Sequence, residues 1–443
     1  MNLLQMWPLG LRLMLFRGLE LLTAQRSGGA RVALPGNPPA HGPAQPSLWL
    51  FVSTIGELNA IEPLLQQVLQ ALGQPPLTLL SDREVYAEAY RARFPQARLV
   101  FLQGGSAEAL ALARTAPPLM CVVAEIPALL HDAPCRMSFA LVKAARDAGA
   151  PVVLVNGWGY GYAPPSRMDA IERALFNRDY LRSFDLLLVQ TEAFASQLIA
   201  QGAAADRVQV VGNIKFDAMD TGAWAVGKTR SPRLLQSLLD AGRPTIVAGC
   251  VTDADEQQRV LDAFASLRSQ AASALLVLAP RHPENPVVMQ TLQSLLQGRG
   301  LPFALRSALG DAPLDDNIAV LALDTMGELR DFYAAAHVAH VGVDHNVLEP
   351  LGFGKPVSVS PGWNATYPSY PVYALLQAQQ GLLEAADAGA LTAAWTRCIA
   401  LGGAQNDTLQ RSRQALAQAK GATQRHMLAL APWLARARRS AAG

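Results

Sequence analysis

Short apolar runs alternate with amphipathic helical segments along most of the chain, and this alternation constrains the fold more than any other feature. In the first half, runs such as LWLFVS at 48–53 and LMCVVAE at 119–125 are followed by a turn or by a helix-like pattern. The rhythm breaks near 220–243 and restarts with PTIVAGC at 244–250. Apolar runs joined by helices are typical of parallel strands covered on both faces. We therefore predict two successive α/β units.

Length and composition agree with this organisation. The 443 residues exceed the ~250 to 300 at which a single core stops growing. With 51% hydrophobic and 16% charged residues the composition is globular, and a net charge of +2 gives no field that would gather nucleic acid. The four cysteines lack CxxC spacing, which favours buried thiols in a reducing, cytosolic compartment.

The first 27 residues are strongly apolar but contain Arg12, Arg17 and Glu20, so they do not form an uncharged membrane span. With Trp7 and interspersed arginines, we predict that 1–27 is an amphipathic helix at the membrane interface. The alternative is a helix packed on the body of the protein. The basic tail ARARRSAAG favours the first interpretation, because one anionic leaflet would attract both ends.

The remaining boundaries follow from Gly and Pro content and from the break in rhythm. We predict a linker at 28–47, a first α/β domain at 48–220, a second at 221–405, and a C-terminal helical segment at 406–443 that could cross back to the first domain. In such sheets ligands bind beyond the carboxyl ends of the strands. Candidate site residues are therefore those that follow each apolar run.

Two acidic residues follow runs in the first domain. Glu57, in STIGE, is placed to act as a general base on a hydroxyl, and its alternative role is an ordinary first-turn glutamate favoured by the helix dipole. Glu125 ends LMCVVAE, where burial without a partner would be costly, so we expect it to face a cleft. Glu57 and Glu125 are our candidate catalytic residues.

Three segments of the second domain have the composition of an anion or nucleotide site. Arg281 and His282 follow a strand, and the Arg281 guanidinium suits a phosphate, although pairing with a surface carboxylate is the alternative. DTMGEL at 324–329 predicts a helix start with free amides for a phosphate, capped by Asp324 or Thr325 with Glu328 completing a capping box.

The third segment is HNVLEP at 345–350. Asn346 and Glu349 have the spacing of an N-cap and its capping-box partner, but Pro350 lacks the N–H for a regular first turn. A distorted turn with a projecting carboxylate would suit the vicinal hydroxyls of a ribose. Metal binding is disfavoured: the DxD in TDADE at 252–256 fits helix caps better, and the histidines show no zinc spacing.

Taken in order, these segments resemble the 3-deoxy-D-manno-octulosonic acid (Kdo) transferases of lipopolysaccharide synthesis. STIGE is similar to the family's A-S-V-G-E, and AEIP to the second half of E-T-E-x-W-P. VVGNIKFD resembles the segment containing N-[LI]-K-[FY]-D. LAPRHPE, DTMGEL with FYAAA, and HNVLEPLGFGKPV also match closely, so the resemblance covers about 48–357.

The resemblance implies a GT-B glycosyltransferase with two Rossmann-like domains facing a central cleft and with neither cofactor nor catalytic metal. It implies inverting transfer of Kdo from CMP-Kdo to a lipid A-type glycolipid, by a peripheral protein on the cytoplasmic face of the inner membrane. Glu57 would be the general base. Around the donor the resemblance places Lys215, Arg281, His282, Thr325, Met326, Gly327, Glu328, Asn346 and Glu349.

The sequence also departs from the family pattern. Asp344 stands where a glycine is expected, NGWGYGYAPPS replaces N-A-R-x-S-x-R-S, and the first glutamate and the tryptophan of E-T-E-x-W-P are absent. Two alternatives therefore stay open. One is a GT-B transferase that uses another nucleotide sugar for a surface polysaccharide, and the other is a non-catalytic relative that binds a glycolipid.

Overall fold

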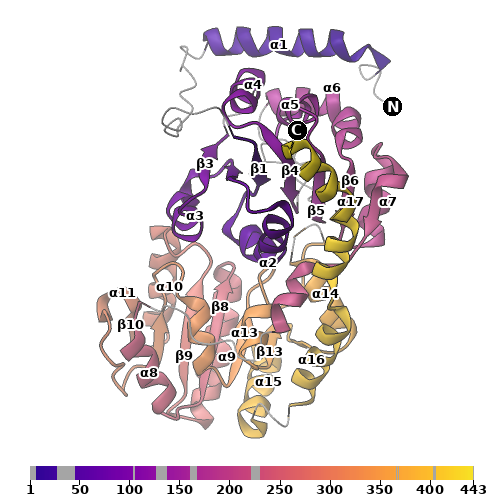
Figure 1. Ribbon diagram of the computed structural model, residues 1–443. Coiled ribbons are helices and arrows are strands. Elements are labelled where there is room, and N and C mark those ends of the chain that lie inside the picture. Colours follow the sequence, from indigo (N-terminus) through magenta and orange to yellow (C-terminus); the bar gives the residue numbers. More distant parts are fainter. Residues whose placement is uncertain are drawn as a thin grey trace. The chain divides into compact units, whose positions relative to one another are not determined.

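The chain forms two compact units, Met1–Ala218 with Ala419–Gly443 (unit 1) and Met219–Gln418 (unit 2) (Figure 1). The computed structural model describes residues 6–26, 45–102, 105–125, 137–159, 167–220, 230–365, 367, 369–402 and 406–442. Most of the predicted linker at 28–47 and most of the aromatic stretch NGWGYGYAPPS lie outside the described residues.

Unit 1 contains a seven-stranded sheet with the order β3-β2-β1-β4-β5-β6-β7, and every neighbouring pair is parallel. The strands are β1 (Ser47–Phe51), β2 (Leu77–Ser81), β3 (Arg98–Phe101), β4 (Pro118–Ala124), β5 (Val152–Gly157), β6 (Leu186–Val189) and β7 (Val208–Val210). The helices are α1 (Leu9–Arg26), α2 (Ile55–Leu72), α3 (Ala87–Arg93), α4 (Ser106–Thr115), α5 (Phe139–Asp147), α6 (Arg167–Ser183), α7 (Glu192–Ala200) and α17 (Ala422–Ala442).

Successive side chains of β1 pack on opposite faces of this sheet, as a strand period of two requires. Trp49 and Phe51 join a core with residues of α5 and α6, while Leu48 and Leu50 join a second core with residues of α2 and α17. Because both faces are covered, all five residues of β1 are buried. The prediction of a parallel sheet covered on both faces is confirmed.

Unit 2 repeats the architecture, with strand order β10-β11-β9-β8-β12-β13-β14 and parallel pairing throughout. The strands are β8 (Thr245–Val251), β9 (Leu275–Pro280), β10 (Phe303–Leu305), β11 (Val320–Ala322), β12 (Val338–Val341), β13 (Val357–Val359) and β14 (Leu383–Glu384). The helices are α8 (Pro232–Asp240), α9 (Ala254–Gln270), α10 (Pro286–Gly298), α11 (Arg306–Leu309), α12 (Leu329–Phe332), α13 (Leu348–Gly352), α14 (Tyr370–Ala378), α15 (Ala388–Leu401) and α16 (Asp407–Ala419).

The C-terminal segment forms two helices rather than one. It breaks at Lys420 and Gly421, where Gly421 has a φ of 88°, a left-handed conformation that glycine adopts without strain. The first helix, α16, lies almost entirely within unit 2, whereas α17 belongs to unit 1 and packs on α2 and β4 (Figure 1).

Helix α1 is attached to unit 1 by one narrow stripe. Arg12 is 4% exposed and forms an ion pair with Asp179 at 2.6 Å, while Phe16 packs edge-on against Phe176 with ring centroids 5.5 Å apart. Glu20 accepts hydrogen bonds from the backbone and hydroxyl of Ser106. Among the described helices, none has the length and apolar character needed to cross a membrane.

Candidate functional site

In unit 1 the strand order reverses between β1 and β4, and two of the predicted carboxylates follow these strands. A reversal of this kind leaves a crevice beyond the carboxyl ends of the strands, where open α/β sheets bind ligands. Glu57 lies in the first turn of α2, directly after β1, and Glu125 is the residue after β4. The fold thus places both carboxylates at the position expected for chemistry.

Glu57 is held by the cap of α2. Thr54 is the N-cap and accepts a hydrogen bond from the Glu57 N–H at 3.2 Å, and Glu57 Oε2 accepts one from the Ser53 N–H at 2.7 Å. The residue is 3% exposed. Its other oxygen, Oε1, is buried and has no hydrogen-bond partner among the described residues. One carboxylate oxygen is therefore fixed and the other remains available to a proton.

The electrostatics of Glu57 differ from those of an exposed glutamate. Burial, with the nearby charge of Glu125, raises the pKa of Glu57 to about 8, although the Ser53 N–H and Lys215 act in the opposite direction. A carboxyl group whose pKa lies near the working pH is suited to accept a proton during a reaction. Glu57 therefore combines a buried, unbonded carboxylate oxygen with a raised pKa.

Glu125 is 1% exposed and has a φ of 56°, a left-handed conformation that costs a non-glycine residue ~1–3 kcal/mol. Its Oε1 pairs with the Lys215 ammonium at 2.8 Å and accepts a hydrogen bond from Asn156 Nδ2 at 3.0 Å. These bonds provide the partners that a buried carboxylate needs. Within unit 1, Lys215 thus lies beside Glu125.

Unit 2 has the corresponding reversal between β8 and β12. The two strand ends approach closely: the Gly342 N–H donates to the Gly249 carbonyl at 2.9 Å, and Thr252 Oγ1 donates to the Val343 carbonyl at 3.1 Å. A Cβ at Gly342 would lie 2.0 Å from the Cys250 carbonyl oxygen, so no side chain fits there. The segment VGVDHN begins at this crevice.

Arg281 follows β9 and lies near the same crevice. Its guanidinium is 5.9 Å from the centre of the Tyr367 ring, and Nη2 donates to the tyrosine hydroxyl at 3.3 Å. Burial lowers the pKa of His345 to about 4, and Arg281 contributes to this effect. His282 is exposed and pairs with Glu284 at 3.0 Å. Arg281 therefore has the surroundings of a site residue, while His282 lies in a surface pair.

The cap-like interpretation of Asn346 and Glu349 is realised in part. Helix α13 begins at Leu348, whose N–H donates to Asn346 Oδ1 at 3.0 Å, and Asn346 Nδ2 lies 3.4 Å from Glu349 Oε1. Pro350 lacks the N–H of a regular first turn, in keeping with the distorted opening. Glu349 is half-buried, and burial raises the pKa of its carboxyl group.

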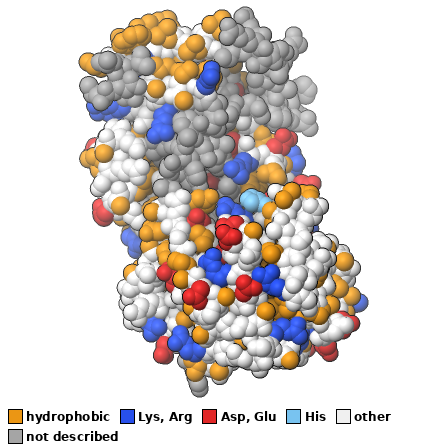
Figure 2. Space-filling model, turned by 180° about the vertical axis from the view of Figure 1, so that it is seen from behind, with side chains coloured by type: hydrophobic (Ala, Val, Ile, Leu, Met, Phe, Trp, Pro, Cys, Tyr) orange, Lys and Arg blue, Asp and Glu red, His pale blue; other side chains and the backbone are white. Residues whose placement is uncertain are grey.

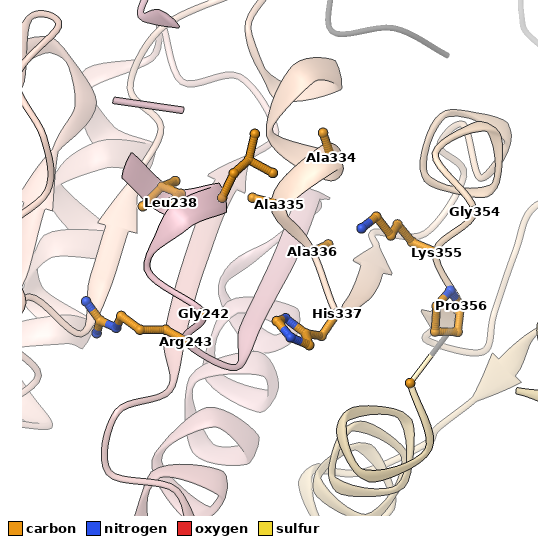
Figure 3. A pocket seen from close by; sticks show the side chains of 12 residues that line it. Leu238, Gly242, Arg243, Ala334, Ala335, Ala336, His337, Gly354, Lys355 and Pro356 are labelled. Carbon is orange, nitrogen blue, oxygen red and sulfur yellow. The ribbon is translucent and has the colours of Figure 1, made fainter. Parts of the chain in front are cut away.

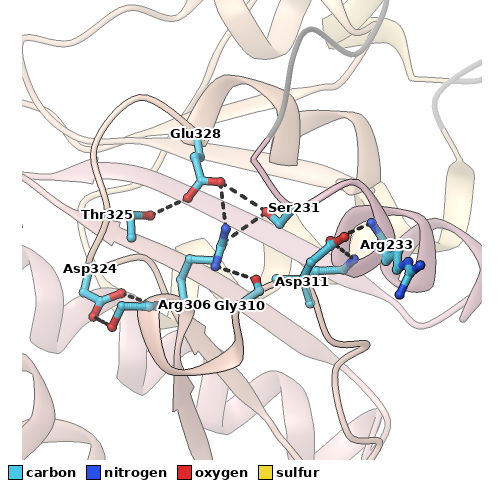
Figure 4. A network of polar contacts seen from close by, with 10 residues as sticks. Ser231, Arg233, Arg306, Gly310, Asp311, Asp324, Thr325 and Glu328 are labelled. Carbon is cyan, nitrogen blue, oxygen red and sulfur yellow. Dashed lines mark hydrogen bonds and ion pairs between the residues drawn. The ribbon is translucent and has the colours of Figure 1, made fainter.

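The capping box expected at 324–328 is wrong. Asp324 accepts hydrogen bonds from Ser307 on α11, and α12 spans only Leu329–Phe332, with Glu328 at its start. Glu328 is 3% exposed and forms an ion pair with Arg306 at 2.9 Å (Figure 4). Although burial opposes it, hydrogen bonds from Thr325 and Arg306 lower the pKa of Glu328.

The Glu328 carboxylate is therefore committed to a structural network, because Thr325 and Ser231 also donate to it at 2.7 and 3.1 Å. Met326 is 60% exposed. Gly327 has a φ of 85°, and the space where a Cβ would stand is open. The exposed part of DTMGEL is thus Met326 and Gly327.

Asp344, the unexpected acid, anchors a loop. Its φ is 67°, its Oδ1 accepts from the Asn364 N–H at 2.7 Å, and its carbonyl accepts from Ser369 Oγ at 2.8 Å. Aspartate tolerates left-handed geometry better than most residues do. One carboxylate oxygen is thus directed to the backbone of the segment that also carries Tyr367.

Comparison with known proteins identifies the family. A family model described as 3-deoxy-D-manno-octulosonic-acid transferase (kdotransferase) matches residues 138–218. The 3-deoxy-D-manno-octulosonic acid transferase of Bordetella pertussis is 30% identical over 360 residues, covering 77% of this chain and 76% of that protein. The chain belongs to the Kdo transferase family. The Haemophilus influenzae enzyme of the same name is 25% identical over 419 residues, covering 90% of this chain and 89% of that protein.

A solved glycosyltransferase from Rickettsia africae shares the fold of this Kdo transferase. Its TM-score is 0.56 at 10% identity, and the match covers 88% of this chain and 98% of that one. At that identity the likeness shows the fold alone. With two seven-stranded parallel sheets, it establishes the predicted α/β, GT-B fold class.

The described part of this Kdo transferase contains no group of three His, Cys, Asp or Glu side chains that could hold a metal ion. TDADE forms a cap, as predicted: Asp253 is the N-cap of α9 and accepts from the Glu256 N–H at 2.9 Å. These carboxylates contribute to the start of a helix.

A cavity of about 290 Å³ in unit 2 lies away from the predicted residues (Figure 3). Among its lining residues, Arg243, His337 and Pro356 each stand one or two positions before a strand, at the amino ends of β8, β12 and β13. In Figure 3 the Lys355 side chain extends toward Ala334 and Ala336. Because the candidate residues discussed above follow strands, this cavity lies at the opposite edge of the sheet.

Sequence reasoning missed three residues of these two sites. Asn156 ends the apolar run PVVLVN, and this position alone does not predict its bond to Glu125. Tyr367 and His426 were not singled out. Nothing in the local sequence indicates that His426 contacts Asn156, 270 positions earlier.

Proposed function

We propose that this chain transfers Kdo from CMP-Kdo to a lipid A-type glycolipid, with Glu57 as the general base. The acceptor hydroxyl gives its proton to Glu57 while its oxygen attacks the anomeric carbon, and CMP leaves with the electrons of the broken bond, so the configuration inverts. The observation that carries the proposal is the buried Glu57 Oε1 without a partner, on a carboxyl group whose pKa is raised to about 8. The identity of the transferred sugar rests on family membership.

The proposed binding site for CMP-Kdo contains Arg281 and residues at the neighbouring strand ends. We assign the phosphate of CMP-Kdo to Arg281 and to the exposed backbone at Met326 and Gly327, and the ribose to Asn346 and Glu349. An arginine aimed at the departing phosphate stabilises the charge that develops there. The Glu328 carboxylate supports this segment, because it accepts hydrogen bonds from Thr325 and from Arg306. Lys215 and His282 are secondary donor ligands in this proposal.

We further propose that α1 places the protein on the cytoplasmic face of the inner membrane. The face of α1 away from Arg12 and Phe16 exposes large apolar side chains, and Figure 2 shows hydrophobic side chains gathered at this end of unit 1. They are Leu11, Met14, Leu15, Leu21 and Leu22, between 40% and 68% exposed. A helix with one apolar face outward suits the interfacial region of a bilayer.

The direct test is turnover of CMP-Kdo with a lipid A precursor by wild type and Glu57→Gln. We expect the variant to lose activity by roughly 100- to 10,000-fold, the usual contribution of a general base. Glu62→Gln on the same helix is the matched control, because its carboxylate lies in an exposed pair with Arg93. Full activity of Glu57→Gln would refute the base assignment. Turnover of a different nucleotide sugar, with none of CMP-Kdo, would refute the donor.

The membrane assignment is tested with the double variant Met14→Glu, Leu22→Glu. Both side chains are exposed, at 66% and 58%, so folding should be unaffected. We expect lost flotation with anionic vesicles and slower turnover of acceptor embedded in them, with unchanged turnover of acceptor in detergent. Unchanged flotation would show that α1 does not hold the protein on lipid.

A further inference from the structure

His426 is a buried histidine on α17, and its two ring nitrogens have distinct partners. Its exposure is 0%, Nδ1 lies 2.7 Å from the Ala422 carbonyl oxygen, and Nε2 lies 3.0 Å from the Asn156 backbone nitrogen. A carbonyl only accepts and an N–H only donates, so Nδ1 carries the proton and Nε2 accepts. Burial lowers the pKa of His426 to about 4, which keeps the ring neutral.

Asn156 connects this histidine to the carboxylate site. Its φ is 53°, and its side chain bridges two segments: Nδ2 donates to Glu125 Oε1 at 3.0 Å, and Oδ1 accepts from the Ile214 N–H at 3.0 Å. Its carbonyl accepts from Gln190 Nε2 at 2.9 Å. All the hydrogen-bonding groups of Asn156 thus have partners, and one of them is a candidate catalytic residue.

The segment beginning at Ile214 closes a ring of contacts with α17. Lys215, next along the chain, pairs with Glu125 at 2.8 Å. Asp217 accepts from the Gly421 and Thr423 N–H groups at 2.7 and 2.6 Å, which fixes the start of α17. The ring therefore runs from α17 through Asn156 and Glu125 to Lys215, and back through Asp217 to α17.

We propose that His426 and Asn156 are positioning residues that hold Glu125 and Lys215 beside Glu57 during glycosyl transfer. The role rests on the proposed function of Glu57. Loss of the His426 acceptor leaves the Asn156 N–H buried without a partner, which favours movement of the strained asparagine. Glu125 and Lys215 would then move relative to Glu57, and both of these charges act on its proton affinity.

The test compares His426→Leu, which removes the acceptor, with His426→Gln, which can retain it, and with Leu430→Ala, which leaves a cavity at a buried position of the same helix. For His426→Leu we expect kcat to fall roughly 10- to 100-fold and the acidic limb of the kcat/KM profile to move by about half a pH unit or more. His426→Gln should restore the limb. Leu430→Ala should lower stability and leave the limb unchanged.

Asn156→Gly gives a second route if His426→Leu does not fold. Glycine adopts the left-handed backbone without strain and keeps the N–H for His426, so only the bridge to Glu125 and Ile214 is lost. We expect the same movement of the limb. If His426→Leu or Asn156→Gly folds with the wild-type limb, α17 is a structural helix only and the proposal is overturned.

A measurement that does not depend on activity separates the positioning role from the proposed base role of Glu57. The Glu57→Gln substitution changes the free energy of unfolding, and the pH dependence of this change reports the pKa of Glu57. It is measured once in the wild-type background and once in the Asn156→Gly background. A changed pKa in the second background supports positioning even if Glu57→Gln is active. An unchanged pKa overturns positioning even if Glu57→Gln is inactive.

Discussion

The helix that follows the first strand of each unit, α2 after β1 and α9 after β8, opens with the same arrangement. In unit 1, Thr54 caps α2 and Glu57 accepts from the Ser53 N–H at 2.7 Å. In unit 2, Asp253 caps α9 and Glu256 accepts from the Thr252 N–H at 2.7 Å. Both glutamates are third in their helices and almost fully buried.

The charge that faces each glutamate distinguishes them. Glu57 faces Glu125, and burial together with that charge raises the pKa of Glu57 to about 8. Glu256 Oε1 lies 3.6 Å from His340 Nε2. Burial alone would raise the pKa of Glu256, but His340 and the Thr252 N–H outweigh it and lower the pKa to about 2. The same capping arrangement thus holds a glutamate with a raised pKa in unit 1 and one with a lowered pKa in unit 2.

The largest expected effect is an opposite pH dependence of stability. The pKa of Glu57 rises on folding from 4.5 to about 8, so its folded form binds the extra proton and stability falls as pH rises between those values. The free energy of unfolding of Glu57→Gln should therefore exceed that of wild type by up to about 5 kcal/mol at pH 9. The pKa of Glu256 is lower in the folded state, about 2, than its ordinary value of 4.5. Its ionised carboxylate therefore stabilises the fold above pH 4.5, and this stabilisation is lost as the pH falls toward 2.

Urea denaturation at pH 4, 6 and 9 measures both effects. Glu256→Gln should be less stable than wild type at pH 6, by up to roughly 3 kcal/mol, with a smaller deficit at pH 4. Glu62→Gln serves again as the exposed control. If both buried substitutions shift stability in the same direction at pH 9, the electrostatic distinction between the units is wrong.

A second prediction concerns the neighbour that sets the Glu57 pKa. Glu125→Gln removes a negative charge that raises this pKa, and Lys215→Met removes a positive charge that lowers it. The acidic limb of the kcat/KM profile should move to lower pH in the first variant and to higher pH in the second, by roughly one pH unit each. His340→Gln, which alters the corresponding neighbour in unit 2, should leave the limb in place. Shifts of equal sign in the first two variants would contradict this account.

The periodicity of the sequence was sufficient to predict the fold because each parallel strand is an apolar run that can be recognised locally. The unpredicted β14 has only two residues, Leu383–Glu384, too few to show a pattern. The capping prediction at Asp324 failed for a tertiary reason, because Ser307 on α11 donates to the Asp324 carboxylate and α12 begins only at Leu329. Asn346 depends on local spacing alone, and its Oδ1 accepts from the Leu348 N–H at the start of α13.

The candidate residues were found at strand ends, but their roles depend on contacts distant in sequence. STIGE and TDADE look alike as helix starts, and the sequence offers no local reason to separate them. The difference comes from Glu125 and His340, 68 and 84 positions later in the chain. The role of Lys215 likewise depends on a pairing with Glu125 across 90 positions.

The smallest expected effect tests what the two units share. Thr54 and Asp253 each accept one backbone hydrogen bond, from Glu57 at 3.2 Å and from Glu256 at 2.9 Å. Thr54→Ala and Asp253→Ala should therefore each cost about 1 kcal/mol of stability in urea denaturation, independently of the charge beyond the cap. Neither should move the limb of the pH profile. A Thr54→Ala variant that moves the limb would show that the cap itself controls the proton on Glu57, and Glu125 would then no longer explain why the two glutamates differ.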